Sequence, residues 1–330
     1  MSKFYNLLFI NFLIFSSLIT ISSYSWLVMW MGMEINLLSM IPIMLYKKNV
    51  YTSESSMKYF LIQSLASTLL IFSMIMMEKN FILSSMKTNP YYLIIEISLL
   101  MKLGMAPFHS WLPEVLEGLN WFSYFWMITW QKLAPMIVLM MILKMNTIMT
   151  LSIIMTSLIS GILGLNQISL RKILAYSSMN HLSWMIMSMM YMSWIWMFYL
   201  VIYFISNLNL IFYFSKLNLF YINQINLLTN NKFLKMFFLM NFLSLSGIPP
   251  FIGFFPKWLT ISFLIFNFQM ILPLILITSS LIHMFMYLRL LLPSLMMKMP
   301  SYKMNKFKFN YMMMMNFLFV FSMPLCNIFM

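Results

Sequence analysis

The chain has 330 residues, of which 62% are hydrophobic and only 8% charged, so a water-soluble fold would expose far more apolar surface than such folds carry. The formal net charge of +14 does not indicate a nucleic-acid-binding protein, because the basic residues are scattered over short loops and no soluble domain could present them as one face. A single cysteine, Cys326, excludes a disulfide framework and a metal site built from cysteines. These properties indicate a polytopic membrane protein.

Long apolar segments follow one another along almost the whole chain. Because a spanning helix needs roughly twenty apolar residues, the sequence predicts an all-α protein with about eleven transmembrane helices. The first begins after a single lysine and has no small-residue cleavage site, so it is interpreted as a spanning helix and not as a removed signal. The predicted helices cover residues 4–22, 25–46, 56–77, 91–119, 122–143, 148–165, 172–191, 194–215, 235–266, 270–292 and 309–328.

The fourth and ninth predicted helices share one unusual spacing of helix-breaking residues. Each has a glycine, a proline three residues later and a second proline six residues after that, which predicts a discontinuous helix with hydrated backbone at the break. Matching breaks in two halves indicate two five-helix repeats, 1–146 and 147–296, followed by one C-terminal transmembrane helix, 297–330. An odd number of helices per repeat predicts that the repeats are inverted in the membrane. The breaking residues are Gly104, Pro107 and Pro113 in the first repeat, and Gly247, Pro250 and Pro256 in the second.

Residue usage and loop charge predict the location and orientation of the chain. The sequence has 42 Met and no Asp, a bias expected of an AT-rich gene in a code where AUA also specifies Met, which indicates a mitochondrial genome. The predicted loops on one side carry many more basic residues than those on the other, and such an excess marks the inner side of a membrane. We therefore expect a multi-pass protein of the mitochondrial inner membrane, with the N-terminus in the matrix and the C-terminus in the intermembrane space. The N-terminal side carries Lys3, Lys47, Lys48, Lys58, Arg171, Lys172, Lys216, Lys232, Lys235, Lys298, Lys303, Lys306 and Lys308, and the other side only Lys79, Lys87 and Lys144.

Four cationic residues, Lys102, Lys132, Lys257 and Arg289, lie within predicted spans, and Glu34 is the glutamate near the middle of one. A charge at the centre of a bilayer costs roughly 3 kcal/mol on insertion scales, so such residues usually face the protein interior and mark ion or proton pathways. The alternative, that they snorkel to an interface, is weaker for the deep Lys102 and Lys132 than for the other two cations. Lysine suits proton transfer because burial favours its neutral form and an approaching carboxylate favours its charged form.

The histidines leave alternatives open. His109 lies within the first break and His181 near the middle of the seventh predicted helix, so either could relay protons between lysines. A histidine that is hydrogen-bonded in a helix interface is an equally good interpretation of both. His283 has no supporting motif and is interpreted as structural.

Several of these segments resemble a known family. The segments LMKLGMAPFH (100–109), WQKLAP (130–135), 177–184 and 247–258 resemble the subunit 2 family of mitochondrial NADH:ubiquinone oxidoreductase (complex I), an antiporter-like membrane subunit, in its animal, insect-like form. The resemblance spans nearly the whole chain and departs mildly at Met105, where a small residue is common. It implies a proton-translocating subunit of the membrane arm, with a Glu34–Lys102 pair, Lys132 as central relay and Lys257 as terminal site.

The resemblance also implies partners and cofactors. It places NADH, FMN, iron–sulfur clusters and ubiquinone in other subunits, and this sequence has no dinucleotide fingerprint, cysteine cluster or phosphate loop of its own. We expect no bound cofactor, metal or nucleic acid; the expected partners are other complex I subunits, inner-membrane lipids such as cardiolipin, and protons with internal water. Two other classes remain open: a stand-alone cation/proton antiporter, which copurification would test, and a scaffold without transport, which would not need charged residues inside the bilayer.

Overall fold

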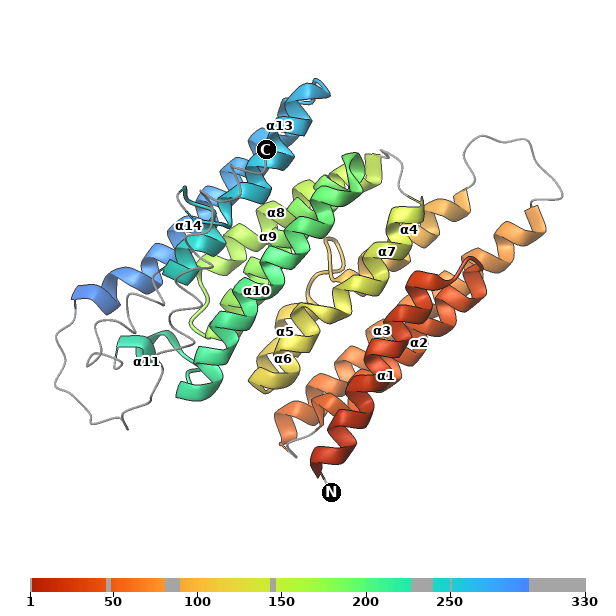
Figure 1. Ribbon diagram of the computed structural model, residues 1–330, viewed down its shortest axis with the longest axis horizontal. Coiled ribbons are helices and arrows are strands. Elements are labelled where there is room, and N and C mark those ends of the chain that lie inside the picture. The colour runs from red at the N-terminus through yellow and green to blue at the C-terminus, as the bar shows by residue number, and fades with distance from the viewer. Residues whose placement is uncertain are drawn as a thin grey trace. The chain divides into compact units, whose positions relative to one another are not determined.

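The computed structural model describes residues 2–45, 49–80, 90–142, 147–226, 240–249 and 251–296. In these ranges the regular elements are helices, accompanied by one isolated β-bridge between Ser169 and Tyr221 (Figure 1). The prediction of an all-α protein is therefore confirmed. The chain divides into two compact units, Met1–Ile153 and Ile154–Met330. The predicted repeat boundaries at 146 and 296 stay predictions, and the predicted C-terminal helix 297–330 lies outside the described residues.

The first unit is built around three long helices that lie side by side in Figure 1, α1, α2 and α3, with contacts between α1 and α2 and between α2 and α3. The helix α4 packs on α3, and two shorter helices, α5 and α6, lead through the 3₁₀ turn η1 into α7. The bounds are α1 Ser2–Ser22, α2 Trp26–Met44, α3 Val50–Asn80, α4 Pro90–Leu103, α5 Trp111–Gly118, α6 Trp121–Ile128, η1 Trp130–Lys132 and α7 Leu133–Ile142.

The second unit is organised around α9, which is buried along nearly its whole length and contacts α10, α13 and α14. This helix is rich in polar residues, and burial among other helices keeps them out of contact with lipid. The helix α8 connects the two units in sequence. The bounds are α8 Thr147–Leu165, α9 Leu170–Tyr191, α10 Ser193–Leu217, α11 Ile222–Asn226, a helical segment 240–246, α13 Phe254–Phe266 and α14 Ile271–Met296.

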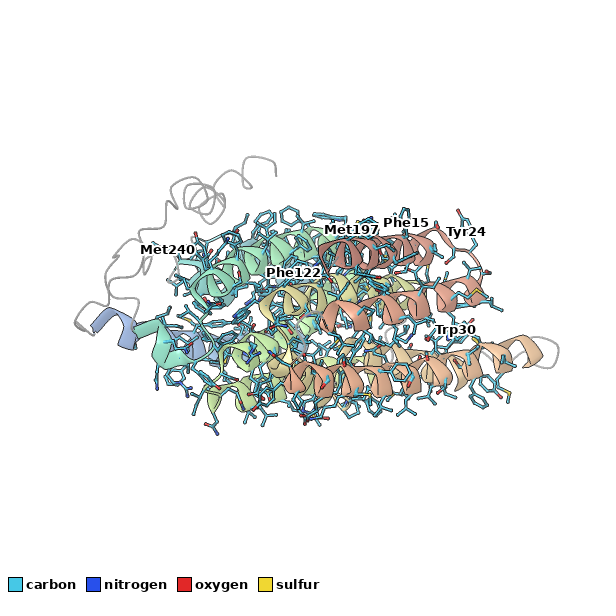
Figure 2. The ribbon with its side chains drawn as sticks, turned by 90° about the horizontal axis from the view of Figure 1, so that it is seen from below. Phe15, Tyr24, Trp30, Phe122, Met197 and Met240 are labelled. Atoms are coloured by element: carbon cyan, nitrogen blue, oxygen red, sulfur yellow. The ribbon has the colours of Figure 1, made fainter. Side chains whose placement is uncertain are left out.

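Seven of the described helical segments are long and apolar enough to cross a membrane. Large apolar side chains on their outer faces are exposed, among them Phe15, Phe122 and Met197, which Figure 2 labels. Many helical serines and threonines donate their hydroxyl hydrogen to the carbonyl three residues earlier, as Ser16 does to Leu13 at 2.8 Å, so these polar groups are satisfied without water. These features fit helices surrounded by lipid. The seven segments are Phe4–Ser22, Trp26–Met44, Val50–Met77, Trp121–Ile142, Thr147–Leu165, Ser193–Leu217 and Ile271–Leu292.

Two predicted helices differ from the observed ones. The third begins at Val50 and not at 56, because Asn49 precedes it as a cap: the Asn49 N–H donates to the Thr52 hydroxyl, which donates back to the Asn49 carbonyl at 2.7 Å. The predicted span 122–143 is found as the apolar segment Trp121–Ile142, but it is not one continuous helix, since α6 ends at Ile128 and η1 separates it from α7. The physical reason is Pro135, which has no N–H to bond with the carbonyl of Gln131.

Candidate functional site

The first helix break begins where α4 ends, at Gly104. The N–H of Gly104 donates to the carbonyl of Met101 at 3.2 Å and the N–H of Met105 to that of Leu100 at 3.0 Å, the pair of bonds that closes a helix around a left-handed residue. Gly104 has a φ of 72°, a conformation that a residue with a side chain rarely adopts. The chain becomes helical again at Trp111, so Pro113 lies in the first turn of α5, where a proline is tolerated.

The break places Lys102 in the last turn of α4, where the negative end of the helix favours a cation. Its side chain is 3% exposed, and its Nζ atom lies 3.8 Å from Oε1 of Glu34 on α2, whose side chain is 24% exposed. That carboxylate oxygen is buried and has no hydrogen-bond partner within the described structure. The ammonium of Lys102 is therefore the cationic group that faces the carboxylate of Glu34.

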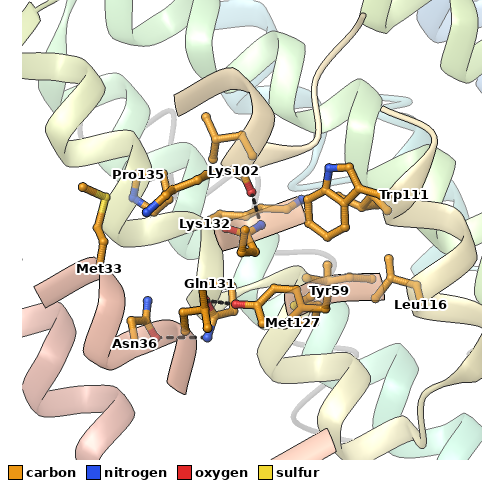
Figure 3. Close-up of a pocket in the computed structure, with 15 residues that line it drawn as sticks. Met33, Asn36, Tyr59, Lys102, Trp111, Leu116, Met127, Gln131, Lys132 and Pro135 are labelled. Atoms are coloured by element: carbon orange, nitrogen blue, oxygen red, sulfur yellow. Dashed lines mark hydrogen bonds between the residues drawn. The ribbon is translucent and has the colours of Figure 1, made fainter. Parts of the chain in front are cut away.

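A cavity of about 30 Å³ lies beside Lys102 and is large enough for one or two water molecules (Figure 3). Both Lys102 and Lys132 line it, although 30 residues separate them in sequence. The rest of the lining comes from α2, α3, α4, α5, α6, η1 and α7 and mixes polar with apolar side chains. The other lining residues are Met33, Asn36, Leu37, Tyr59, Gln63, Leu103, Trp111, Leu112, Leu116, Met127, Ile128, Gln131 and Pro135.

A chain of side-chain hydrogen bonds runs along one wall of the cavity. The hydroxyl of Tyr59 donates to Oε1 of Gln131 at 3.3 Å, and Nε2 of Gln131 donates to Oδ1 of Asn36 at 3.0 Å (Figure 3). Gln63 donates to the carbonyl of Lys102 at 3.1 Å. These amides and the phenol connect α2, α3 and η1. The sequence alone does not indicate them as site residues, because neutral polar residues in a span carry no charge signal.

Lys132 lies in the 3₁₀ turn η1 and is 4% exposed. The turn follows Thr129, whose hydroxyl donates to the carbonyl of Phe125 at 2.6 Å. An interruption of this kind aims successive side chains differently from a continuous α-helix, so Gln131 and Lys132 both reach the cavity. The signal in the sequence was Pro135, which the predicted helix treated as an ordinary interior position.

The second helix break repeats the backbone of the first. The N–H of Gly247 donates to the carbonyl of Ser244 at 3.1 Å and that of Ile248 to the carbonyl of Leu243 at 3.4 Å, with a φ of 78° at Gly247. The chain is helical again from Phe254, so Pro256 lies in the first turn of α13. Pro250 lies outside the described residues.

Lys257 folds back over this second break. Its Nζ atom donates to the carbonyl of Ser246 at 2.9 Å and lies 5.8 Å from the centre of the Trp184 ring. The residue is 5% exposed. In a continuous helix the Ser246 carbonyl would accept from the residue at 250, which is a proline and has no N–H to give.

The two candidate histidines lie in different surroundings. His181 is buried, with Nδ1 2.9 Å from the hydroxyl of Tyr199, and it lines a cavity of about 10 Å³ together with Ser244 and Pro256. His109 is partly exposed, with Nδ1 3.3 Å from the carbonyl of Pro107, and is not among the residues that line the cavity beside Lys102.

Two further groups that the sequence placed inside spans have structural partners. Arg289 donates to the carbonyls of Leu165 and Gln167 at the end of α8. His283 is buried with Nε2 3.1 Å from the hydroxyl of Ser160. Within the described ranges no group of three histidine, cysteine or acidic side chains could hold a metal ion.

The sequence of the chain matches a family of membrane proteins. Residues 23–282 match the family described as NADH:quinone oxidoreductase/Mrp antiporter, transmembrane. Because this match covers most of the chain, the chain belongs to that family.

Individual relatives within this family are similar to the chain over most of its length. The chain is 44% identical over 293 residues to the NADH-ubiquinone oxidoreductase chain 2 of Anopheles gambiae, covering 88% of this chain and 86% of that one. It is 41% identical over 307 residues to the chain 2 of Locusta migratoria, covering 91% and 90%. The fold is similar to a chain of the respiratory complex I of Thermus thermophilus, with a TM-score of 0.87 at 20% identity over 98% of this chain and 79% of that one.

Proposed function

We propose that the chain is a core membrane-arm subunit of respiratory complex I and carries protons across the mitochondrial inner membrane. Electron transfer from NADH to ubiquinone takes place in other subunits, which hold the NADH, FMN, iron–sulfur and ubiquinone sites. The identities of 41–44% to chain 2 proteins over about nine-tenths of the chain support this function. Its partners are therefore the other complex I subunits, with inner-membrane lipids such as cardiolipin around it and water inside it.

One observation carries the proposed mechanism: Lys102 lies buried 3.8 Å from Glu34 and shares a water-sized cavity with Lys132. In this mechanism Lys102 holds a proton whose binding depends on the distance to Glu34, Lys132 relays it, and Lys257 is the terminal site. His181, buried beside a second small cavity, is the better placed of the two candidate relay histidines, and His109 is the alternative.

The magnitudes are compatible with this mechanism. Moving one proton against about 150 mV costs roughly 3.5 kcal/mol. Two unit charges about 4 Å apart interact by about 4 kcal/mol at an effective dielectric constant of 20. A change in the Glu34–Lys102 distance could therefore supply an energy of the size that one translocation step needs.

The same proposal includes the finer architecture. Eleven helices form two inverted repeats, 1–146 and 147–296, with 297–330 as the added C-terminal helix, the N-terminus in the matrix and the C-terminus in the intermembrane space. Besides the seven long apolar segments, the 22-residue α9 and the two interrupted segments are further candidates to span. The eleventh predicted helix, 309–328, and residues 235–239 of the ninth lie outside the described residues.

The test is the substitution Lys102→Met in the assembled complex, made at the corresponding position of a genetically tractable relative. Methionine has a similar volume but cannot hold a proton, so proton translocation through this subunit should be largely lost and NADH:ubiquinone turnover should fall with it. Turnover and proton uptake are measured together in reconstituted vesicles, with assembly confirmed. Full turnover at an unchanged proton-to-electron ratio would contradict the mechanism. The alternative function is a stand-alone cation/proton antiporter, since the family description also includes Mrp antiporters. Cation transport by a chain that does not copurify with complex I would support that alternative.

A further inference from the structure

The side chain of Lys257 crosses directly over the glycine that ends the helical segment 240–246. A Cβ atom at Gly247 would lie 2.9 Å from Cδ, 3.0 Å from Nζ and 3.2 Å from Cε of Lys257. A real Cβ atom almost never lies as close as 2.9 Å to another atom, so one group must shift, and the flexible end of the lysine side chain is the group that can do so. The outer half of the lysine therefore occupies the space that any other residue at position 247 would fill.

The ammonium that rests there has a defined partner. It donates to the Ser246 carbonyl at 2.9 Å, reaching back eleven residues along the chain. That carbonyl is at the C-terminal end of a helix, where the backbone dipoles favour a positive charge. The position of Nζ is therefore set by the carbonyl on one side and by the open face of Gly247 on the other.

No acidic side chain of the same unit could replace this partner. The chain contains no Asp, and its last glutamate is Glu117, so the unit Ile154–Met330 has no carboxylate side chain in its sequence. An ammonium displaced from the Ser246 carbonyl would lose a charge-assisted hydrogen bond in a buried site, and bonds of this kind are about twice as strong as neutral ones. The location of the Lys257 ammonium therefore depends on where the backbone places the Ser246 carbonyl.

We propose that Gly247 is a positioning residue for Lys257: because it lacks a side chain, it lets the ammonium reach the Ser246 carbonyl, the place from which the lysine takes up and releases its proton. This inference rests on the proposed role of Lys257 in proton translocation. Gly247 then has two roles: it adopts the left-handed φ of the turn, and it leaves room for the side chain of Lys257.

The first break supplies a matched control. Gly104 has nearly the same φ, 72°, and the same pair of backbone hydrogen bonds, so an alanine there creates the same backbone strain. Its Cβ would meet Leu112 at 2.7 Å and Trp111 at 3.2 Å, and no lysine atom is among its nearest neighbours. The comparison of the two alanine variants separates strain in the turn from displacement of a lysine.

The experiment compares Gly247→Ala, Gly104→Ala, Lys257→Met and the double variant Gly247→Ala/Lys257→Met in the assembled complex, reconstituted in vesicles. Assembly, kcat and KM for NADH and ubiquinone, and the proton-to-electron ratio are measured for each. Both glycine variants should lower assembly similarly. Per assembled complex, Gly247→Ala should cause at least about half of the loss of proton pumping seen in Lys257→Met, with KM unchanged, and should add nothing to the lysine variant, as expected for groups that act as one unit.

Two results would overturn the inference while leaving the proposed role of Lys257 in place. One is a Gly247→Ala complex that pumps as well as the Gly104→Ala complex, and the other is an effect that adds fully to that of Lys257→Met. Intact pumping in Lys257→Met itself would remove the proposed role of the lysine, and the inference with it. If Gly247→Ala does not assemble, Gly247→Asn and Gly104→Asn replace the alanine pair, because asparagine tolerates a left-handed φ better than other side chains and still fills the space over position 247.

Discussion

The two helix breaks share a backbone but differ in where their charges lie. In the first, Lys102 precedes the glycine and faces the carboxylate of Glu34; in the second, the lysine follows the proline and folds back onto a carbonyl. By the shared spacing, the position of Lys257 is taken in the first break by Glu114, which lies at the surface 3.0 Å from Lys58. Glycine and proline determine the turn, and the residues around them are free to differ, so a shared turn does not imply a shared chemistry.

The same comparison distinguishes two ways to hold a buried ammonium. Beside Glu34 the lysine has an ionisable partner, whose own charge or distance can change. At the Ser246 carbonyl it has a fixed dipole. In the proposed mechanism, the first arrangement suits a lysine whose proton affinity changes during turnover. The second suits a lysine whose position stays the same.

The largest expected effect is on the stability of the second break. A Cβ at Gly253 would lie 1.7 Å from the carbonyl oxygen of Ser244, a backbone atom that cannot move aside. The corresponding residue of the first break is Ser110, which already carries a side chain and is exposed. Gly253→Ala should therefore destabilise the chain by more than about 3 kcal/mol and prevent assembly, whereas Ser110→Ala should be tolerated. The yield of assembled complex and its thermal midpoint measure both, and equal yields would show that the two breaks have the same steric limits.

A smaller effect is expected from removing the charge of Glu34, the carboxylate that faces Lys102 at the first break. In Glu34→Gln the lysine can still bind a proton but loses the charge that modulates it, so turnover should fall about tenfold, a barrier increase near 1.4 kcal/mol, and less than in Lys102→Met. The control is Glu54→Gln, because Glu54 is exposed and pairs with Lys58 at 3.0 Å. Coupled turnover in vesicles is the measurement. A Glu34→Gln complex as active as the control would mean that the two breaks hold their lysines in equivalent ways.

The hydrogen-bond chain beside the first break should contribute less again. Gln131→Leu leaves the Tyr59 hydroxyl and the Asn36 amide oxygen without their partner in a buried site, at a cost of about 1–3 kcal/mol. Tyr59→Phe leaves one buried group, Oε1 of Gln131, without its donor, and the bond it removes is long at 3.3 Å, so it should cost about 1 kcal/mol, the lower end of that range. Thermal midpoints of the two single variants and the double variant test this order. Additive losses would show that the three side chains do not act as one chain.

The sequence predicted the backbone of the site better than its polar lining. Glycine and proline act through local steric rules, so their spacing located both breaks, and the cost of burying charge singled out Lys102, Lys132 and Lys257. Glu34 and Lys102 could be suggested as a pair by resemblance, but their distance of 3.8 Å depends on how α2 and α4 each pack against α3. Local patterns do not contain that packing.

The features of the site that the sequence did not predict are contacts of neutral side chains and contacts that depend on the folded backbone. Tyr59, Gln131 and Asn36 meet from three elements, and nothing within any one of them indicates the contact. The fold of Lys257 onto Ser246 spans only eleven residues, yet it needs the left-handed turn at Gly247, which a proline-based prediction of a break does not describe.

The smallest effect is expected at the surface, where Lys58 pairs with Glu54 and Glu114, each at 3.0 Å. These three side chains are 41%, 60% and 55% exposed, so water and salt screen their charges, whereas the pair Glu34–Lys102 is largely shielded. We expect Lys58→Met to leave turnover and the thermal midpoint nearly unchanged, and any small loss to disappear at about 1 M salt, where the screening length is about 3 Å. The effect of Glu34→Gln should persist at the same salt concentration. A marked, salt-independent loss in Lys58→Met would instead mean that the lysine holds α3 against α5 by packing, and that exposure alone does not separate the surface charges from those of the buried site.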